Sequence, residues 1–128
     1  MPGGNNKKGV LIVDDASFSR SMIKKIINEL DYAEVIGEAT NGNEAIDAYN
    51  KLKPDLVTMD IVMPEKDGIT AIGEIIEIDK TATIIVVTAV GQETLILEAT
   101  EKGAKEFIQK PFDKKDLIAL FDRFLLNK

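Results

Sequence analysis

Five polar residues stand at or directly after the ends of apolar segments of this 128-residue chain: Asp14, Asp15, Asp60, Thr88 and Lys110. Carboxylates brought within a few ångströms repel one another, and a divalent, oxygen-seeking cation such as Mg²⁺ relieves that repulsion. A carboxylate beside such a cation can attack phosphorus, and an ammonium and a hydroxyl can stabilise the oxygens of the transferring phosphoryl group. The set therefore predicts Mg²⁺-dependent phosphoryl acceptance, with Asp60 as the acceptor.

Each of these residues also has an interpretation without chemistry. An Asp at a strand end is often a turn residue or the N-cap of the next helix. Thr88 could be an ordinary β-branched strand residue, and Lys110 one more surface lysine. The occurrence of all five residues together favours the chemical interpretation, because unrelated surface residues need not all fall at the same end of their strands.

The hydrophobic pattern predicts the elements that bring these positions together. Short apolar runs alternate with segments whose apolar residues recur every three or four positions, which indicates strands alternating with amphipathic helices. The expected strands are 10–13, 35–37, 56–59, 84–88 and 106–109, and the expected helices are 18–30, 43–52, 70–78, 92–102 and 114–126. Five such βα units predict an α/β fold, a doubly wound parallel sheet that binds ligands beyond the carboxyl ends of its strands.

Composition narrows the function further. The chain has no Cys and no His, which excludes disulfides, thiolate nucleophiles, histidine-bound metals and a role as a phosphohistidine carrier. Its 22 acidic and 16 basic residues give a formal net charge of −6, which argues against nucleic acid as the main partner. We expect a cytoplasmic protein that does not insert into a membrane. Residues 1–8 are polar and are expected to form a flexible tail.

Short motifs in order along the chain resemble those of the receiver domain of two-component response regulators, and most of all its stand-alone chemotaxis members. They are Asp14-Asp15, Met59-Asp60-Ile61-Val62-Met63-Pro64, Asp67-Gly68, Thr88-Ala89 and Lys110-Pro111-Phe112. The resemblance covers residues 9–127, so we expect one receiver domain and no output domain. It implies the flavodoxin-like (βα)5 fold with strand order 2-1-3-4-5.

The resemblance implies a role for each acidic position. Asp60 is implied to accept a phosphoryl group from a sensor histidine kinase, in a protein that catalyses only its own phosphorylation and dephosphorylation. Asp15, Asp60 and the backbone carbonyl of Val62 are implied to bind Mg²⁺, with Asp14 assisting directly or through water. Carboxylate and carbonyl oxygens are the ligands that Mg²⁺ prefers, so these roles agree with the residue types.

Two further positions are implied to form a switch. Thr88 is expected to move toward the phosphoryl group and Phe107 to swing inward behind it, which remodels the surface of the fourth helix, fifth strand and fifth helix. That surface is the expected binding site for a motor switch protein or an adaptor to the motor. Phe107 has a simpler interpretation as plain core, and it lacks a hydroxyl that could anchor either rotamer. The Lys110–Pro111 peptide bond is cis in the family and is expected to be cis here.

Val62 and Val90 lie two residues after Asp60 and Thr88, where polar residues of the family influence the attacking water. Neither valine can orient water, so we expect slow intrinsic dephosphorylation and dependence on a phosphatase that supplies its own amide.

The last two features concern helices. Leu95, Ile96 and Leu97 are consecutive, so at least one is expected to point outward and contribute to docking. We interpret Gly68 and Gly103 as backbone devices, the first for a turn and the second as a helix C-cap.

Several alternatives remain at this point. A flavin-binding electron carrier shares the fold, but Asp14-Asp15 would repel phosphate in its first loop, and the chain has no Trp. A Mg²⁺-dependent phosphatase of the haloacid dehalogenase type uses a similar residue set, but with an Asp-x-Asp pattern after the first strand. A receiver-like adaptor would never be phosphorylated. Within the receiver family, a monomeric chemotaxis regulator competes with a phosphorelay intermediate or a regulator outside chemotaxis.

Overall fold

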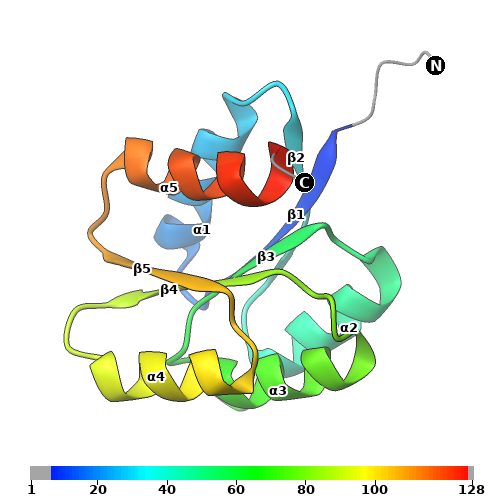
Figure 1. Cartoon of the computed structure of the whole chain (residues 1–128), viewed down its shortest axis with the longest axis vertical. Helices are drawn as coiled ribbons and strands as arrows, with labels where there is room; N and C mark the ends of the chain where they lie inside the picture. The colour runs from blue at the N-terminus through cyan, green and yellow to red at the C-terminus, as the bar shows by residue number, and fades with distance from the viewer. Residues whose placement is uncertain (1–6, 127–128) are drawn as a thin grey trace.

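A five-stranded parallel sheet forms the centre of the molecule, with helices on both faces (Figure 1). The structure is a computed structural model and describes residues 7–126. The strands are β1 (Lys8–Val13), β2 (Ala33–Ala39), β3 (Leu56–Met59), β4 (Ile84–Ala89) and β5 (Glu106–Lys110). The helices are α1 (Ser17–Asn28), α2 (Gly42–Leu52), α3 (Gly68–Ile78), α4 (Glu93–Lys102) and α5 (Lys114–Phe121), which continues into a π-helical segment (Asp122–Leu126).

The strands are arranged in the order β2-β1-β3-β4-β5, and every neighbouring pair is parallel. This confirms the predicted flavodoxin-like fold. Parallel neighbours need crossover connections, and these place α1 and α5 on one face of the sheet and α2, α3 and α4 on the other (Figure 1). Val13 and Met59 are partners in the β1–β3 register, so Asp14 and Asp60 leave the sheet at the same level.

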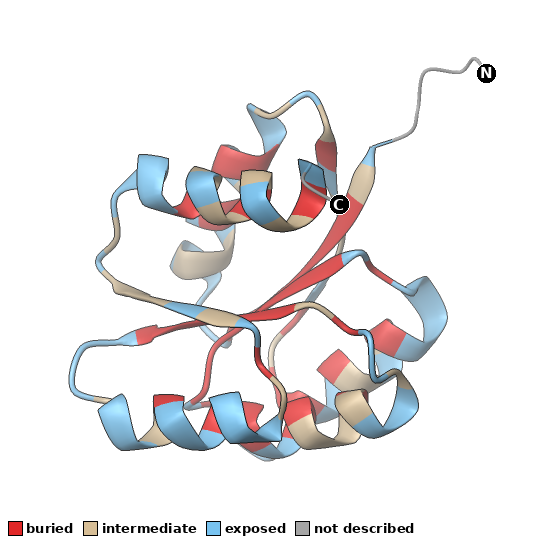
Figure 2. Ribbon diagram, viewed as in Figure 1, coloured by how far each residue is buried: buried red, intermediate tan, exposed pale blue. Residues whose placement is uncertain are grey.

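The central strands bury side chains on both faces. In β1, Val10 and Ile12 pack in the cluster formed with α1 and α5, whereas Leu11 and Val13 pack in the cluster formed with α2, α3 and α4. Figure 2 shows the same strands buried at the centre of the fold. Burial on both faces explains why the sequence shows short apolar runs rather than strict alternation. Within residues 7–126, none of the helices has the length and apolar character needed to span a bilayer.

The edge strand β2 is longer than the expected strand over residues 35–37. Glu34 and Glu38 are exposed and interrupt the apolar run, because an edge strand is less completely covered than a central one. Lys8, expected to end the tail, is the first residue of β1 and is the register partner of Ala33. Residues 1–6 of the expected tail lie outside the described residues.

The expected helix over residues 114–126 is α-helical only through Phe121. The π-helical segment that follows keeps the buried face continuous, since Phe121 and Leu125 are both buried against the α1–α5 side of the sheet. Residue 127, which we expected to end the domain, lies outside the described residues.

Gly68 begins α3 at a point where two stretches of backbone approach closely. Its N–H donates a hydrogen bond to the Ile61 carbonyl at 2.8 Å. A Cβ atom at this position would overlap the Asp60 carbonyl oxygen and lie 2.9 Å from the Ile61 Cα. Close approach, and not a turn conformation, is therefore the reason for a glycine here. Gly103, with a φ of 126°, caps α4 as expected.

We expect Gly68→Ala to lower the free energy of unfolding by at least about 2 kcal/mol, because the backbone of Asp60 would have to move. Gly73→Ala in the same helix is the matched control. Its Cβ would lie 3.6 Å from the Lys102 Cδ, so it should raise the free energy of unfolding by about 0.5–1 kcal/mol through helix propensity. Urea unfolding followed by circular dichroism measures both; changes of the same sign would contradict this account.

Candidate functional site

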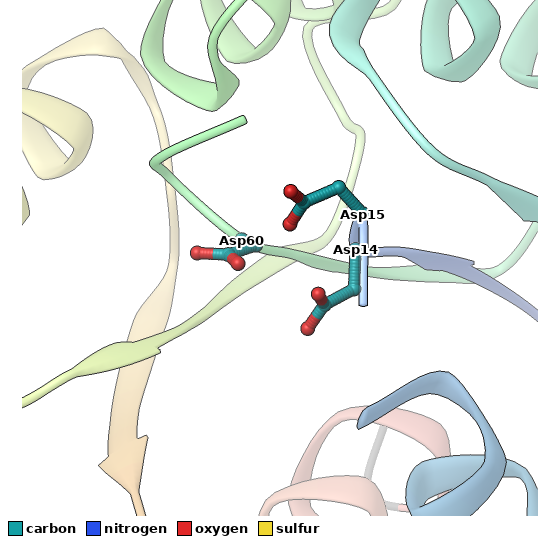
Figure 3. A group of neighbouring side chains, drawn as sticks. All are labelled: Asp14, Asp15 and Asp60. Carbon is teal, nitrogen blue, oxygen red and sulfur yellow. The ribbon is translucent and has the colours of Figure 1, made fainter. Parts of the chain in front are cut away.

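Three carboxylates meet at the carboxyl ends of β1 and β3 (Figure 3). One oxygen each from Asp14, Asp15 and Asp60 lies within 4.8 Å of the others. Asp14 and Asp60 are 1% and 8% exposed, whereas Asp15 is exposed to solvent. The predicted cluster therefore has two carboxylates set into the fold and one at its surface.

The ammonium of Lys110, the last residue of β5, projects into this cluster. Its Nζ atom lies 2.7 Å from Asp14 Oδ2 and 3.6 Å from Asp60 Oδ2. The same Nζ atom lies 3.2 Å from the Ser19 hydroxyl oxygen. Three carboxylates and one ammonium leave two formal negative charges without a partner in the cluster. Charge and donor type thus both fit a divalent cation that prefers oxygen ligands.

Burial also affects the ionisation of the Asp60 carboxyl. Desolvation raises the pKa of its carboxyl above the usual range, the Lys110 ammonium opposes that rise, and the Asp14 carboxylate adds to it. The backbone N–H of Val62 also favours the charged form, at 3.4 Å from Asp60 Oδ1. A further positive charge at this position would hold Asp60 in the ionised form, which is the nucleophilic one.

Asp14 is both a turn-forming residue and a member of the acidic cluster. Its Oδ1 accepts a hydrogen bond from the Ala16 N–H at 2.9 Å, as a turn-forming aspartate does, and its Oδ2 accepts from Lys110. Both oxygens are already engaged. Asp15 and Asp60 are therefore the carboxylates better placed to contact a cation directly.

The remaining predicted residues lie in β4 and β5 and in the segments that follow β3, β4 and β5. Thr88 is the penultimate residue of β4, 1% exposed, and its register partner in β5 is Gln109, the neighbour of Lys110. Phe107 is 44% exposed, so it is not plain core. Val62 and Val90 are both exposed, and neither carries a polar side-chain atom. The Lys110–Pro111 peptide bond is cis.

A network of three residues that the sequence did not predict, Arg20, Glu38 and Lys24, supports the end of β1. Arg20 Nη1 donates to the Asp14 carbonyl at 2.7 Å, and its Nε donates to Glu38 Oε1 at 3.0 Å. The Lys24 Nζ atom lies 2.5 Å from Glu38 Oε2. The hydrogen bond from Lys24, with a smaller effect of the one from Arg20, lowers the pKa of the Glu38 carboxyl. Arg20 sits in the second turn of α1, so helix spacing could have placed it near Asp14. Its pairing with Glu38 depends on β2 lying beside β1.

Comparison with known families identifies the class of protein. The family model described as the response regulator receiver domain matches residues 10–122. The chain belongs to this family. Membership decides against the flavin-binding electron carrier and the haloacid dehalogenase-type phosphatase that the sequence had left as alternatives.

Among the relatives, chemotaxis proteins called CheY are prominent. CheY of Thermotoga maritima is 54% identical over 116 residues, covering 91% of this chain and 96% of the relative, and CheY of Bacillus subtilis is 48% identical with the same coverage. A solved structure of a CheX–CheY–BeF3–Mg²⁺ complex from Borrelia burgdorferi aligns with a TM-score of 0.85, 38% identity, and coverage of 91% of this chain and 89% of that one. The chain is a receiver domain of the CheY type.

Proposed function

We propose that this protein is a signalling switch in which Asp60 accepts a phosphoryl group from a sensor histidine kinase. The observation that carries the proposal is the placement of the Asp60 carboxylate. It lies beside two other carboxylates and the Lys110 ammonium at the carboxyl ends of the strands. An Asp60 oxygen forms a bond to phosphorus while the bond from phosphorus to the donor's imidazole nitrogen breaks, leaving its electron pair on that nitrogen. The product is an acyl phosphate.

Asp15, Asp60 and the backbone carbonyl of Val62 are the proposed Mg²⁺ ligands, with Asp14 in support. Bound there, the cation would neutralise charge on the carboxylates and on a phosphoryl oxygen. The receiver would catalyse only its own phosphorylation and dephosphorylation. The B. burgdorferi structure, a complex of CheX and CheY with BeF3 and Mg²⁺, supports this assignment by similarity.

Lys110 and Thr88 supply the proposed response to phosphorylation. A phosphoryl group adds about 1.5–2 negative charges and three strong acceptors, so an ammonium and a hydroxyl nearby gain new hydrogen bonds. These contacts exist only in the phosphorylated state, and such differential contact is what shifts a two-state equilibrium. Phe107 would follow Thr88 by moving inward from its exposed position.

Incubation with acetyl phosphate and Mg²⁺ tests the acceptor. We expect the intact mass to rise by about 80 Da, with the adduct removed by hydroxylamine, because an acyl phosphate is labile to nucleophiles. Asp60→Asn should show no gain, and omission of Mg²⁺ should reduce the gain strongly. An unmodified parent protein would favour the adaptor that is never phosphorylated, and an adduct on Asp60→Asn would place the acceptor elsewhere.

The lifetime of the phosphoryl group tests the proposed roles of Val62 and Val90. Both side chains are exposed and apolar, so they leave the attacking water without an orienting partner. A Val62→Asn, Val90→Glu double variant should lose its phosphoryl group about tenfold faster than the parent. Decay of the adduct, followed by intact mass after removal of acetyl phosphate, measures the rate; equal lifetimes would refute these roles.

We propose that the output surface lies over α4, β5 and α5. Leu97 and Phe107 are 61% and 44% exposed, and Leu95 and Ile96 face the core, as expected for a helix with one outward leucine. A shallow hollow of about 370 Å³ lies between α4 and β5. Its lining residues are Glu93, Ile96, Leu97, Thr100, Phe107 and Gln109. The names of the CheY relatives support a chemotaxis motor switch protein or its adaptor as the partner, with a separate phosphatase ending the signal.

Affinity capture from cells of the source organism, with and without beryllofluoride and Mg²⁺, tests this surface. We expect a motor component to be retained only with beryllofluoride, and Leu97→Ser to reduce its retention at least about fivefold. Leu52→Ser changes a leucine that is 41% exposed on α2 and is the matched control. Retention of a histidine-containing phosphotransfer protein instead would favour the phosphorelay alternative.

A further inference from the structure

Lys110 makes its closest contacts away from Asp60. The distance from its Nζ to Asp60 Oδ2 is 3.6 Å, which is longer than a hydrogen bond, whereas Asp14 Oδ2 and the Ser19 hydroxyl lie at 2.7 and 3.2 Å. An ammonium has three donors, and two of them are directed to Asp14 and Ser19. The resting position of Lys110 is thus on the α1 side of the site.

Ser19 is well placed to hold that position. It is the third residue of α1, partly buried, and α1 begins directly after the acidic pair. The first turn of a helix carries a partial positive charge, which disfavours an ammonium near it. The Ser19 hydroxyl oxygen and the Asp14 carboxylate together offset this effect by accepting hydrogen bonds from Lys110.

We propose that Ser19 is a positioning residue, which holds Lys110 beside Asp14 and so opposes its transfer to a phosphoryl group on Asp60. The inference rests on the proposed function, because it assumes that Lys110 contacts the phosphoryl oxygens. The hydrogen bond to Ser19 stabilises the resting arrangement and is lost when the ammonium moves toward Asp60. Ser19 therefore sets part of the energetic difference between the two states.

The test uses beryllofluoride as the phosphoryl mimic, in the presence of saturating Mg²⁺, with affinity measured by calorimetry. Ser19→Ala should bind beryllofluoride about three- to tenfold more tightly than the parent, the range expected for removing one hydrogen bond from the resting state only. Ser19→Thr keeps the hydroxyl and should bind like the parent. Ser21→Ala changes an exposed serine of the same helix and serves as the matched control.

A double-mutant cycle separates positioning from a structural effect. In a Lys110→Met background, Ser19→Ala should change beryllofluoride affinity by less than about twofold, since its partner is absent. An equal gain in both backgrounds would overturn the proposal. So would unchanged or weaker binding by Ser19→Ala while the parent binds normally, and that result would leave the proposed function intact. Failure of the parent to bind beryllofluoride at all would refute the proposed function itself.

Discussion

Repulsion among three carboxylates at the ends of β1 and β3 governs how the surrounding site is built. Asp14 and Asp60 are held at the same level because Val13 and Met59 are register partners, and both strands are buried on each face. The acidic groups cannot separate without disrupting the core. Their charge must therefore be balanced in place, and Lys110 provides one part of that balance from a strand at the far edge of the sheet.

The position of Lys110 links the acidic cluster to two other parts of the molecule. Its ammonium contacts Asp14 and Ser19 near the start of α1, while its backbone ends β5, the strand that carries the exposed Phe107. A new negative charge on Asp60 would draw the ammonium away from α1 by a short distance. In the proposed switch, this movement would carry a change at Asp60 to the surface formed by β5 and α4.

Contacts to the backbone of Asp14 and Asp60 fix the positions of these two residues. Arg20 binds the Asp14 carbonyl and is itself held by Glu38 of β2, so the first strand end is anchored to the neighbouring strand. Gly68 lets the start of α3 pack directly against the backbone of Asp60. Neither Arg20 nor Gly68 is a proposed phosphoryl or metal ligand. Both restrict the positions of Asp14 and Asp60, and small displacements of reacting atoms would cost large factors in rate in the proposed phosphoryl transfer.

The alternation of strands and helices, the parallel sheet and the five polar positions at strand ends could all be predicted from the sequence. These are local properties, because apolar runs mark buried strands and the polar residue that follows each run marks its end. Three other features become evident only in the folded chain: Ser19 contacts Lys110, Arg20 joins Asp14 to Glu38, and Phe107 is exposed. Those features depend on contacts between residues of different elements, up to 91 positions apart, whose spacing leaves no periodic signal in the chain.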